Sequence, residues 1–248
     1  MSSTGSTIEQ SIIAKARETG ASLAGIARVS ALKDSPSYAV YDRRPYYREY
    51  KGVEWPKGWK SVLVWALAHP ASRPSLDWWS KKVPGFTPGN HVLMDQSKKI
   101  RVWIEQELGI KALPLAYQIE SGGVFLKDSA VLAGLGVFGK NNLLVTPEFG
   151  PRVRLRGIFL EADLEPTGPL PDFDPCRDCD TPCFRSCPRN AFDSGRYERD
   201  SCKLEMDKCN ANGTLIEGPI MGIDEPSDTV KFCRNCEFSC PIGREAAG

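Results

Sequence analysis

Nine cysteines, all after residue 171, have a spacing that suits metal binding. The first run reads C-x2-C-x3-C-x3-C-P, the last reads C-x2-C-x3-C-P, and two further cysteines lie between the runs. In chain order they are Cys176, Cys179, Cys183, Cys187, Cys202, Cys209, Cys233, Cys236 and Cys240. A cubane iron–sulfur cluster needs three thiolates from one tight loop and a fourth from elsewhere in the chain, and these runs provide both.

The first run differs by one residue from that of bacterial two-cluster ferredoxins, in which three cysteines bind one cluster and the fourth binds the other. This crossed arrangement gives Cys240 to the first cluster and Cys187 to the second. The last ligand of the second cluster is then Cys202 or Cys209. The first set is Cys176, Cys179, Cys183 and Cys240, and the second is Cys187, Cys233, Cys236 and one of those two.

Zinc sites and disulfides are the alternatives for so many cysteines. Zinc ribbons also use C-x2-C pairs, and disulfides are rare in a reducing compartment. Eight usable thiolates and two Cys-Pro endings favour two [4Fe-4S] clusters. Adjacent clusters imply a path for single electrons, so we expect the first 170 or so residues to hold the electron acceptor.

Charge and hydropathy exclude several classes of partner. Residues 1–171 hold 22 basic and 16 acidic side chains, residues 172–248 hold 10 and 15, and the formal net charge is +1. Such a balance gives no reason to expect a nucleic acid or an anionic membrane as partner. The N-terminal residues do not have the pattern of a signal peptide, and no apolar run approaches the roughly 18 residues of a membrane span. We therefore expect a cytoplasmic protein that is not bound to a membrane.

Helix and strand patterns alternate before the cysteines. Ser6 and Glu9 have capping-box spacing ahead of a helix that Gly20 ends. Two apolar runs bounded by turn residues, 22–29 and 61–68, predict strands that are buried on both faces. Later patterns predict a helix over 91–108, a strand over 112–117 and a second helix over 124–132. Residues 142–164 are expected to form a hairpin with a long loop around Thr146–Pro151.

This order predicts an α/β domain over residues 1–171, followed by a small cysteine domain over residues 172–248. A proline-rich connector, 165–175, joins the two. Residues 133–142, AGLGVFGKNN, contain G-x-G-x-x-G, but the motif follows a helical pattern rather than a strand, so it is not a dinucleotide fingerprint. Glycines at a helix end instead suit a close approach of the backbone to another group.

Two motifs resemble known families. Residues 120–127, ESGGVFLK, followed by AGLGVFGKNNLL, resemble epoxyqueuosine reductase, whose pattern runs approximately D-S-A-P-V-L-E-R and then A-G-L-G-W-I-G-K-N. The next stretch, LLVTPEFGPRVRL, resembles the L-I-T-P-E-Y-G-P-R-V-R motif of reductive dehalogenases. The likeness covers roughly residues 110–245, with a thinner one at Gly89-Asn90-His91, which resembles D-Y-H of the queuosine enzyme.

The resemblance implies a nitroreductase-like α/β domain that holds base-off cobalamin, followed by a bacterial-ferredoxin-like domain with two [4Fe-4S] clusters. It also implies Cys202 as the remaining ligand, because the interval from Cys187 to Cys202 fits these families better than that to Cys209. The candidate cofactor-binding residues are Gly134, Gly136, Gly139, Lys140, Asn141 and His91. His69 is expected to be a structural hydrogen-bonding residue.

Glu120 matches the aspartate that is the proposed proton donor of the queuosine enzyme. A carboxyl group held in a dry pocket over a corrinoid has its pKa raised by desolvation, which suits it to donate a proton. Gly123 stands where the family has proline, which puts the local backbone shape in doubt.

Three functions are open. The first is a cobalamin-dependent reductase that takes electrons from a ferredoxin- or flavodoxin-type donor and reduces a small organic substrate with Glu120 as proton donor. The second is a protein that binds or reduces a corrinoid for a partner without small-molecule turnover. The third is a plain two-cluster electron carrier.

Overall fold

The structure is a computed structural model and describes residues 7–38, 57–116, 124–216, 220 and 227–243. In chain order its elements are α1 (Ile8–Glu18), β1 (Leu23–Arg28), α2 (Val29–Lys33), β2 (Ser61–Ala68), η2 (Pro74–Asp77), α4 (Pro88–Glu107), β3 (Ala112–Pro114), α5 (Leu126–Leu132), β4 (Val137–Phe138), β5 (Leu144–Val145), β6 (Val153–Leu160), α6 (Pro182–Arg185), α7 (Arg199–Ala211), β7 (Thr214–Ile216), β8 (Ser227–Thr229) and α8 (Asn235–Phe238). The fold is therefore mixed α/β. No helix of the described part of the chain is long and apolar enough to span a membrane.

The chain divides into two compact units. The first comprises Met1–Leu67, Asp95–Gly136 and Leu155–Asp172. The second comprises Ala68–Met94, Val137–Arg154 and Phe173–Gly248, so it contains all nine cysteines together with segments from the middle of the chain. The predicted separation into residues 1–171 and 172–248 stays a prediction.

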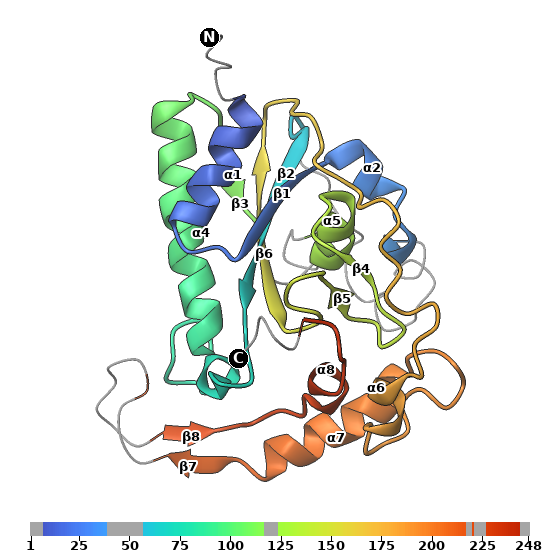
Figure 1. The fold of residues 1–248 in the computed structure, drawn as a ribbon. Coiled ribbons are helices and arrows are strands. Elements are labelled where there is room, and N and C mark those ends of the chain that lie inside the picture. The colour runs from blue at the N-terminus through green and yellow to red at the C-terminus, as the bar shows by residue number, and fades with distance from the viewer. Residues whose placement is uncertain (1–6, 39–56, 117–123, 217–219, 221–226, 244–248) are drawn as a thin grey trace. The chain divides into compact units, whose positions relative to one another are not determined.

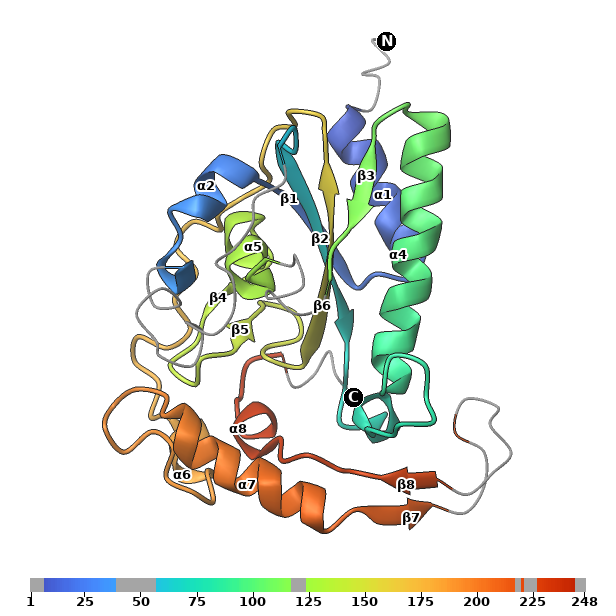
Figure 2. The same ribbon diagram turned by 180° about the vertical axis from the view of Figure 1, so that it is seen from behind.

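A four-stranded sheet with the order β1-β2-β6-β3 forms the centre of the first unit. Its described pairings are antiparallel: Leu23 pairs with Ala66 between β1 and β2, and Ala112 with Leu160 between β3 and β6. Helices α1 and α4 lie on one face of the sheet, and α2 and α5 lie on the other (Figure 1, Figure 2). Both faces are thus covered, as the apolar runs predict, and β2 is buried over its first six residues.

The core of this unit contains large side chains of the central strands. Trp65 and Phe159 are almost completely buried, and the Trp65 indole Nε1 donates a hydrogen bond of 2.9 Å to the Gln96 side chain on α4. A buried indole N–H needs such an acceptor, because an unpaired one would cost free energy. The bond therefore holds α4 against strand β2 of the sheet.

The first helix begins one residue later than the predicted capping box. Thr7 is the N-cap: its side chain accepts a hydrogen bond from the Gln10 backbone, and the Gln10 side chain accepts one from the Thr7 backbone. The prediction of a Ser6–Glu9 box is wrong because threonine and glutamine satisfy the same pattern one position along. The Glu9 carboxylate instead accepts a hydrogen bond from the Glu165 backbone.

The predicted hairpin over 142–164 is also wrong. Strand β5 pairs with β4, with Val145 opposite Val137, whereas β6 joins the main sheet. The two runs do not pair because Thr146 and Gly150 close a short loop between them, in which each backbone N–H donates to the other's carbonyl at 2.9 Å. Strand β6 lies between β2 and β3 in the main sheet.

Candidate functional site

The two cysteine runs fold into two similar turns in the second unit. Each contains one turn of helix that is followed by Ser-Cys-Pro. The helical turn is α6 in the first run, where it contains Cys183, and α8 in the last run, where it contains Cys236. The hydroxyl of Ser186 donates to the Cys183 carbonyl at 3.1 Å, and that of Ser239 donates to the Cys236 carbonyl at 3.4 Å. The two hydroxyl groups also contact one another at 3.0 Å. This serine pair joins the turns, and cysteine spacing alone gave no sign of it.

The thiols of the first predicted set lie close together. The pKa of Cys183 is raised to about 11, mainly by burial and then by the nearby sulfurs of Cys240, Cys176 and Cys179, in that order. Burial also raises the pKa of Cys240, and the same two N-terminal thiols contribute. The fold therefore brings Cys240 beside three cysteines that precede it by at least 57 residues.

The second predicted set is brought together in the same way. The pKa of Cys236 is raised to about 12 by burial first, then by Cys233, Glu237, Cys202 and Cys187. All four thiols of this set thus interact. All nine cysteines lie in the described part of the chain, and none forms a disulfide.

Cys209 lies at the edge of the second set. It follows Cys202 by seven residues, or about two turns, on α7. Burial is the main cause of the raised pKa of Cys233, and the charge of Cys209 raises it more than that of Cys187 does. Cys202 and Cys209 therefore both lie near the other thiols of the second set, so the structure does not choose between them as the remaining ligand.

Among the described residues, no three His, Cys, Asp or Glu side chains converge as ligands of one metal ion. In a cubane each thiolate binds a different iron, so the sulfurs surround a volume instead of meeting at one point. A small pocket lies between the first cysteine set and the β4–β5 turn. Its lining includes Cys176, Cys179, Cys183, Cys240, Lys140 and Asn141.

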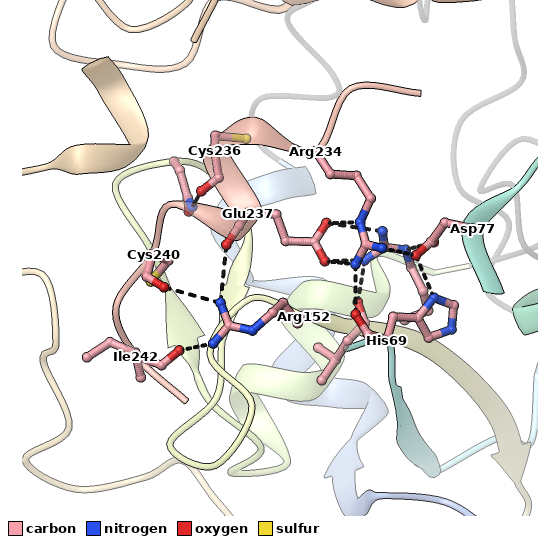
Figure 3. Close-up of polar contacts among 11 residues, drawn as sticks. His69, Asp77, Arg152, Arg234, Cys236, Glu237, Cys240 and Ile242 are labelled. Carbon is pink, nitrogen blue, oxygen red and sulfur yellow. Dashed lines mark hydrogen bonds and ion pairs between the residues drawn. The ribbon is translucent and has the colours of Figure 1, made fainter. Parts of the chain in front are cut away.

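A network of partly buried charges lies beside the second turn. Asp77 accepts contacts from His69 Nδ1 at 2.9 Å and Arg154 Nε at 2.9 Å, and it also pairs with Arg234. Glu237, which is 4% exposed, pairs with the same two arginines. Figure 3 shows this network beside Cys236. Two carboxylates and two guanidinium groups balance, so the network is neutral when His69 is neutral.

Burial and pairing act in opposite directions on this network. Desolvation lowers the pKa of His69 more than its contact with Asp77 raises it, so the imidazole is held neutral. For Asp77, burial would raise the pKa, but the hydrogen bond from His69 and the charges of Arg154 and Arg234 outweigh it, and the pKa is lowered. Packing is tight as well: a Cβ on Gly89 would lie 2.2 Å from the His69 ring. His69 is thus the structural hydrogen-bonding residue that the sequence indicates.

The candidate glycines have different surroundings. Gly134 has a φ of +74°, and a Cβ there would lie 3.0 Å from Gly168, so this glycine permits close backbone contact within the first unit. Gly136 is buried in the same unit. Gly139 belongs to the second unit, and its N–H donates to the Leu143 carbonyl at 2.8 Å. Their contact with a corrinoid stays a prediction.

The polar candidate residues Lys140, Asn141 and His91 differ in exposure and in their contacts. Lys140 is exposed at the rim of the pocket beside the first cysteine set. Asn141 is 4% exposed, and its amide donates to the Cys236 carbonyl at 3.3 Å, which places it at a cysteine turn. His91 is half-buried in the first turn of α4. Glu120 lies outside the described residues. Sequence reasoning missed Asp77, Arg234 and Glu237, because no local motif marks them.

Comparisons with known proteins find relatives that are named as reductases. No family model matches the chain. Epoxyqueuosine reductase of Bacillus anthracis is 24% identical over 263 residues, which cover 94% of this chain and 64% of that protein. Tetrachloroethene reductive dehalogenase of Desulfitobacterium hafniense is 32% identical over 174 residues, which cover 68% and 28%.

Solved structures show the same fold. Epoxyqueuosine reductase from Streptococcus thermophilus matches 96% of this chain and 66% of its own, with a TM-score of 0.64 and 22% identity. A reductive dehalogenase whose structure suggests a mechanism for B12-dependent dehalogenation matches 99% and 35%, with a TM-score of 0.56 and 17% identity.

The sequence matches support membership of the superfamily that contains the epoxyqueuosine reductases and the reductive dehalogenases. The structural matches show the shared fold. The relatives in both branches are reductases. The chain spans slightly less than two thirds of the Bacillus anthracis protein and under a third of the dehalogenase.

The charge network predicts a pH dependence of stability. The unfolded chain takes up a proton on His69 near pH 6.5, whereas the folded chain resists it, so the free energy of unfolding falls as pH drops below about 6.5. The slope approaches about 1.4 kcal/mol per pH unit for one proton. His69→Gln removes this component, and His91→Gln, which changes the only other histidine, retains it. Urea unfolding between pH 8 and pH 5 measures the effect, and parallel curves for wild type and His69→Gln would contradict it.

Proposed function

We propose that this protein is a cobalamin-dependent iron–sulfur reductase that passes single electrons through two [4Fe-4S] clusters to a corrinoid and on to an organic substrate. The observation that carries the proposal is the grouping of the thiols. Cys240 lies beside Cys176, Cys179 and Cys183, and the thiols of Cys187, Cys202 and Cys233 lie near Cys236. We assign Cys176, Cys179, Cys183 and Cys240 as the ligands of one cluster and Cys187, Cys202, Cys233 and Cys236 as the ligands of the other.

The finer architecture is part of the proposal. We assign the α/β part to a nitroreductase-like domain that holds base-off cobalamin, and the C-terminal part to a ferredoxin-like domain. Gly134, Gly136, Gly139, Lys140, Asn141 and His91 are the residues assigned to the cofactor. Support comes from likeness to both branches of the superfamily, one of which includes the B12-dependent dehalogenation enzyme.

When bound, the clusters supply one-electron transfer and the corrinoid supplies a strongly reducing metal centre. Reduction of the substrate consumes two electrons, delivered one at a time by a reduced ferredoxin or flavodoxin in the cytoplasm. Glu120 donates the proton that the substrate carbon takes up, and water restores it. Two electrons and one proton would replace a leaving group on that carbon by hydrogen, and the group would depart as an anion, so that charge balances.

Cofactor stoichiometry tests this function. Iron-reconstituted protein is titrated anaerobically with cobalamin, and cobalt and iron are counted after desalting. About one cobalt per eight irons, with a base-off spectrum, is expected because two cubanes contain eight irons. Glu120→Gln should retain both metals and lose substrate reduction by reduced viologen. Eight irons without cobalt would leave only an electron carrier, and full turnover by Glu120→Gln would remove its assigned role.

The ninth cysteine gives a separate test of the ligand set. Cys202→Ser is expected to lose about four of eight irons, because an alkoxide replaces a thiolate less well at a cubane corner. Cys209→Ser should retain all eight. Iron and sulfide are counted after anaerobic reconstitution of each variant. The assignment of Cys202 would be overturned by iron loss in Cys209→Ser with retention in Cys202→Ser.

A further inference from the structure

The segment 146–152 packs against the turn that carries the last cysteine. Thr146 is fully buried, and its hydroxyl accepts a hydrogen bond from the Phe149 backbone and donates one to the Gly150 carbonyl, both at 3.1 Å. Together with the backbone pair between Thr146 and Gly150, these bonds close a rigid loop. The motif that resembles the dehalogenases therefore has a structural role at the cysteine site.

Two glycines allow the backbones to touch. Gly150 has a φ of +55°, and a Cβ there would lie 2.0 Å from the Ile242 carbonyl oxygen. Gly243 has a φ of +67°, and a Cβ there would lie 2.4 Å from the Gly150 nitrogen. Side chains fit at neither position, so the loop and the turn after Cys240 lie in direct contact.

Arg152 completes this contact with its guanidinium group. The residue is 3% exposed, and its Nη1 donates to the carbonyls of Glu237 at 3.3 Å and Cys240 at 3.2 Å. Its Nη2 donates to the Ile242 carbonyl. One planar fork thus binds three carbonyls of a single turn, as Figure 3 shows, and a lysine ammonium does not reproduce this geometry.

The same guanidinium group places its positive charge beside the backbone of Cys240. At the other turn, the Cys236 carbonyl accepts from Asn141, a neutral amide. The carbonyl of Cys240 is therefore bound by a cationic side chain and that of Cys236 by a neutral amide.

We infer that Arg152 is a positioning residue that fixes the Cys240 turn and raises the reduction potential of the cluster that Cys240 binds. The inference rests on the proposed function, because it needs Cys240 to be a cluster ligand. Reduction adds one negative charge to a cluster, so a fixed positive charge nearby stabilises the reduced form more than the oxidised form. Arginine holds that charge at every pH at which proteins fold.

Redox titration of the reconstituted protein, followed by electron paramagnetic resonance, tests the inference. In Arg152→Gln, the ratio of reduced to oxidised protein for one cluster should fall about tenfold at a fixed potential, equivalent to ~59 mV. In Arg152→Lys, which keeps the charge, the potential should change less, but a chelator should remove iron faster than from wild type. Arg28→Gln, which removes an arginine that pairs with Glu165 in the first unit, is the matched control and should behave as wild type.

Each outcome decides between the inference and the proposed function. Wild type without iron–sulfur clusters would overturn both. Wild type with two clusters, and Arg152 variants with unchanged potential and iron release, would overturn the inference alone. If Arg152→Gln holds only four irons, the positioning role is supported directly. If Arg152→Gln does not fold, iron release from Arg152→Lys carries the test, and release at the wild-type rate would overturn the inference.

Discussion

The cost of ionising closely grouped cysteine thiols away from water is the constraint that shapes the second unit. Each of the thiols Cys183, Cys236 and Cys240 is harder to ionise, first because it is desolvated and then because other sulfurs lie nearby. Iron removes this penalty, because it binds thiolates and takes up their charge. Under the proposed function, metal binding would therefore be coupled to the folding of these turns.

The protein supports these turns with buried polar groups that neutralise one another. Glu237 follows a cysteine of α8 directly and is held by Arg154 and Arg234, which also hold Asp77. Removing one partner from such a network leaves a buried charge, which costs about 3–5 kcal/mol. The network thus links β6, η2 and α8, so the position of the cysteine turn depends on segments far away in the sequence.

Sequence patterns predicted most of the strands and one long-range grouping, and they missed the other long-range contacts. Cysteine spacing assigned Cys240 to the first set, because a tight loop supplies only three thiolates to a cubane and the fourth must come from elsewhere in the chain. Apolar runs located β1 and β2 to within one residue at each end. The Ser6–Glu9 box failed by one residue because Thr7 and Gln10 offer the same chemistry. The pairing of Asp77 with Arg234 joins residues 157 positions apart, and no periodicity encodes such a contact. Arg152 and Arg154 alternate as in a half-buried strand, a pattern that does not reveal that their guanidinium groups bind the cysteine turn.

The central claim is that eight thiolates bind two separate cubanes. Mössbauer spectroscopy of protein reconstituted with iron-57, before and after reduction by dithionite, tests it most directly. The account predicts a single type of oxidised [4Fe-4S] spectrum that accounts for all the iron, and paramagnetic spectra from two interacting clusters after reduction. Iron in isolated tetrathiolate sites, or a spectrum from one cluster with four thiols left free, would contradict it.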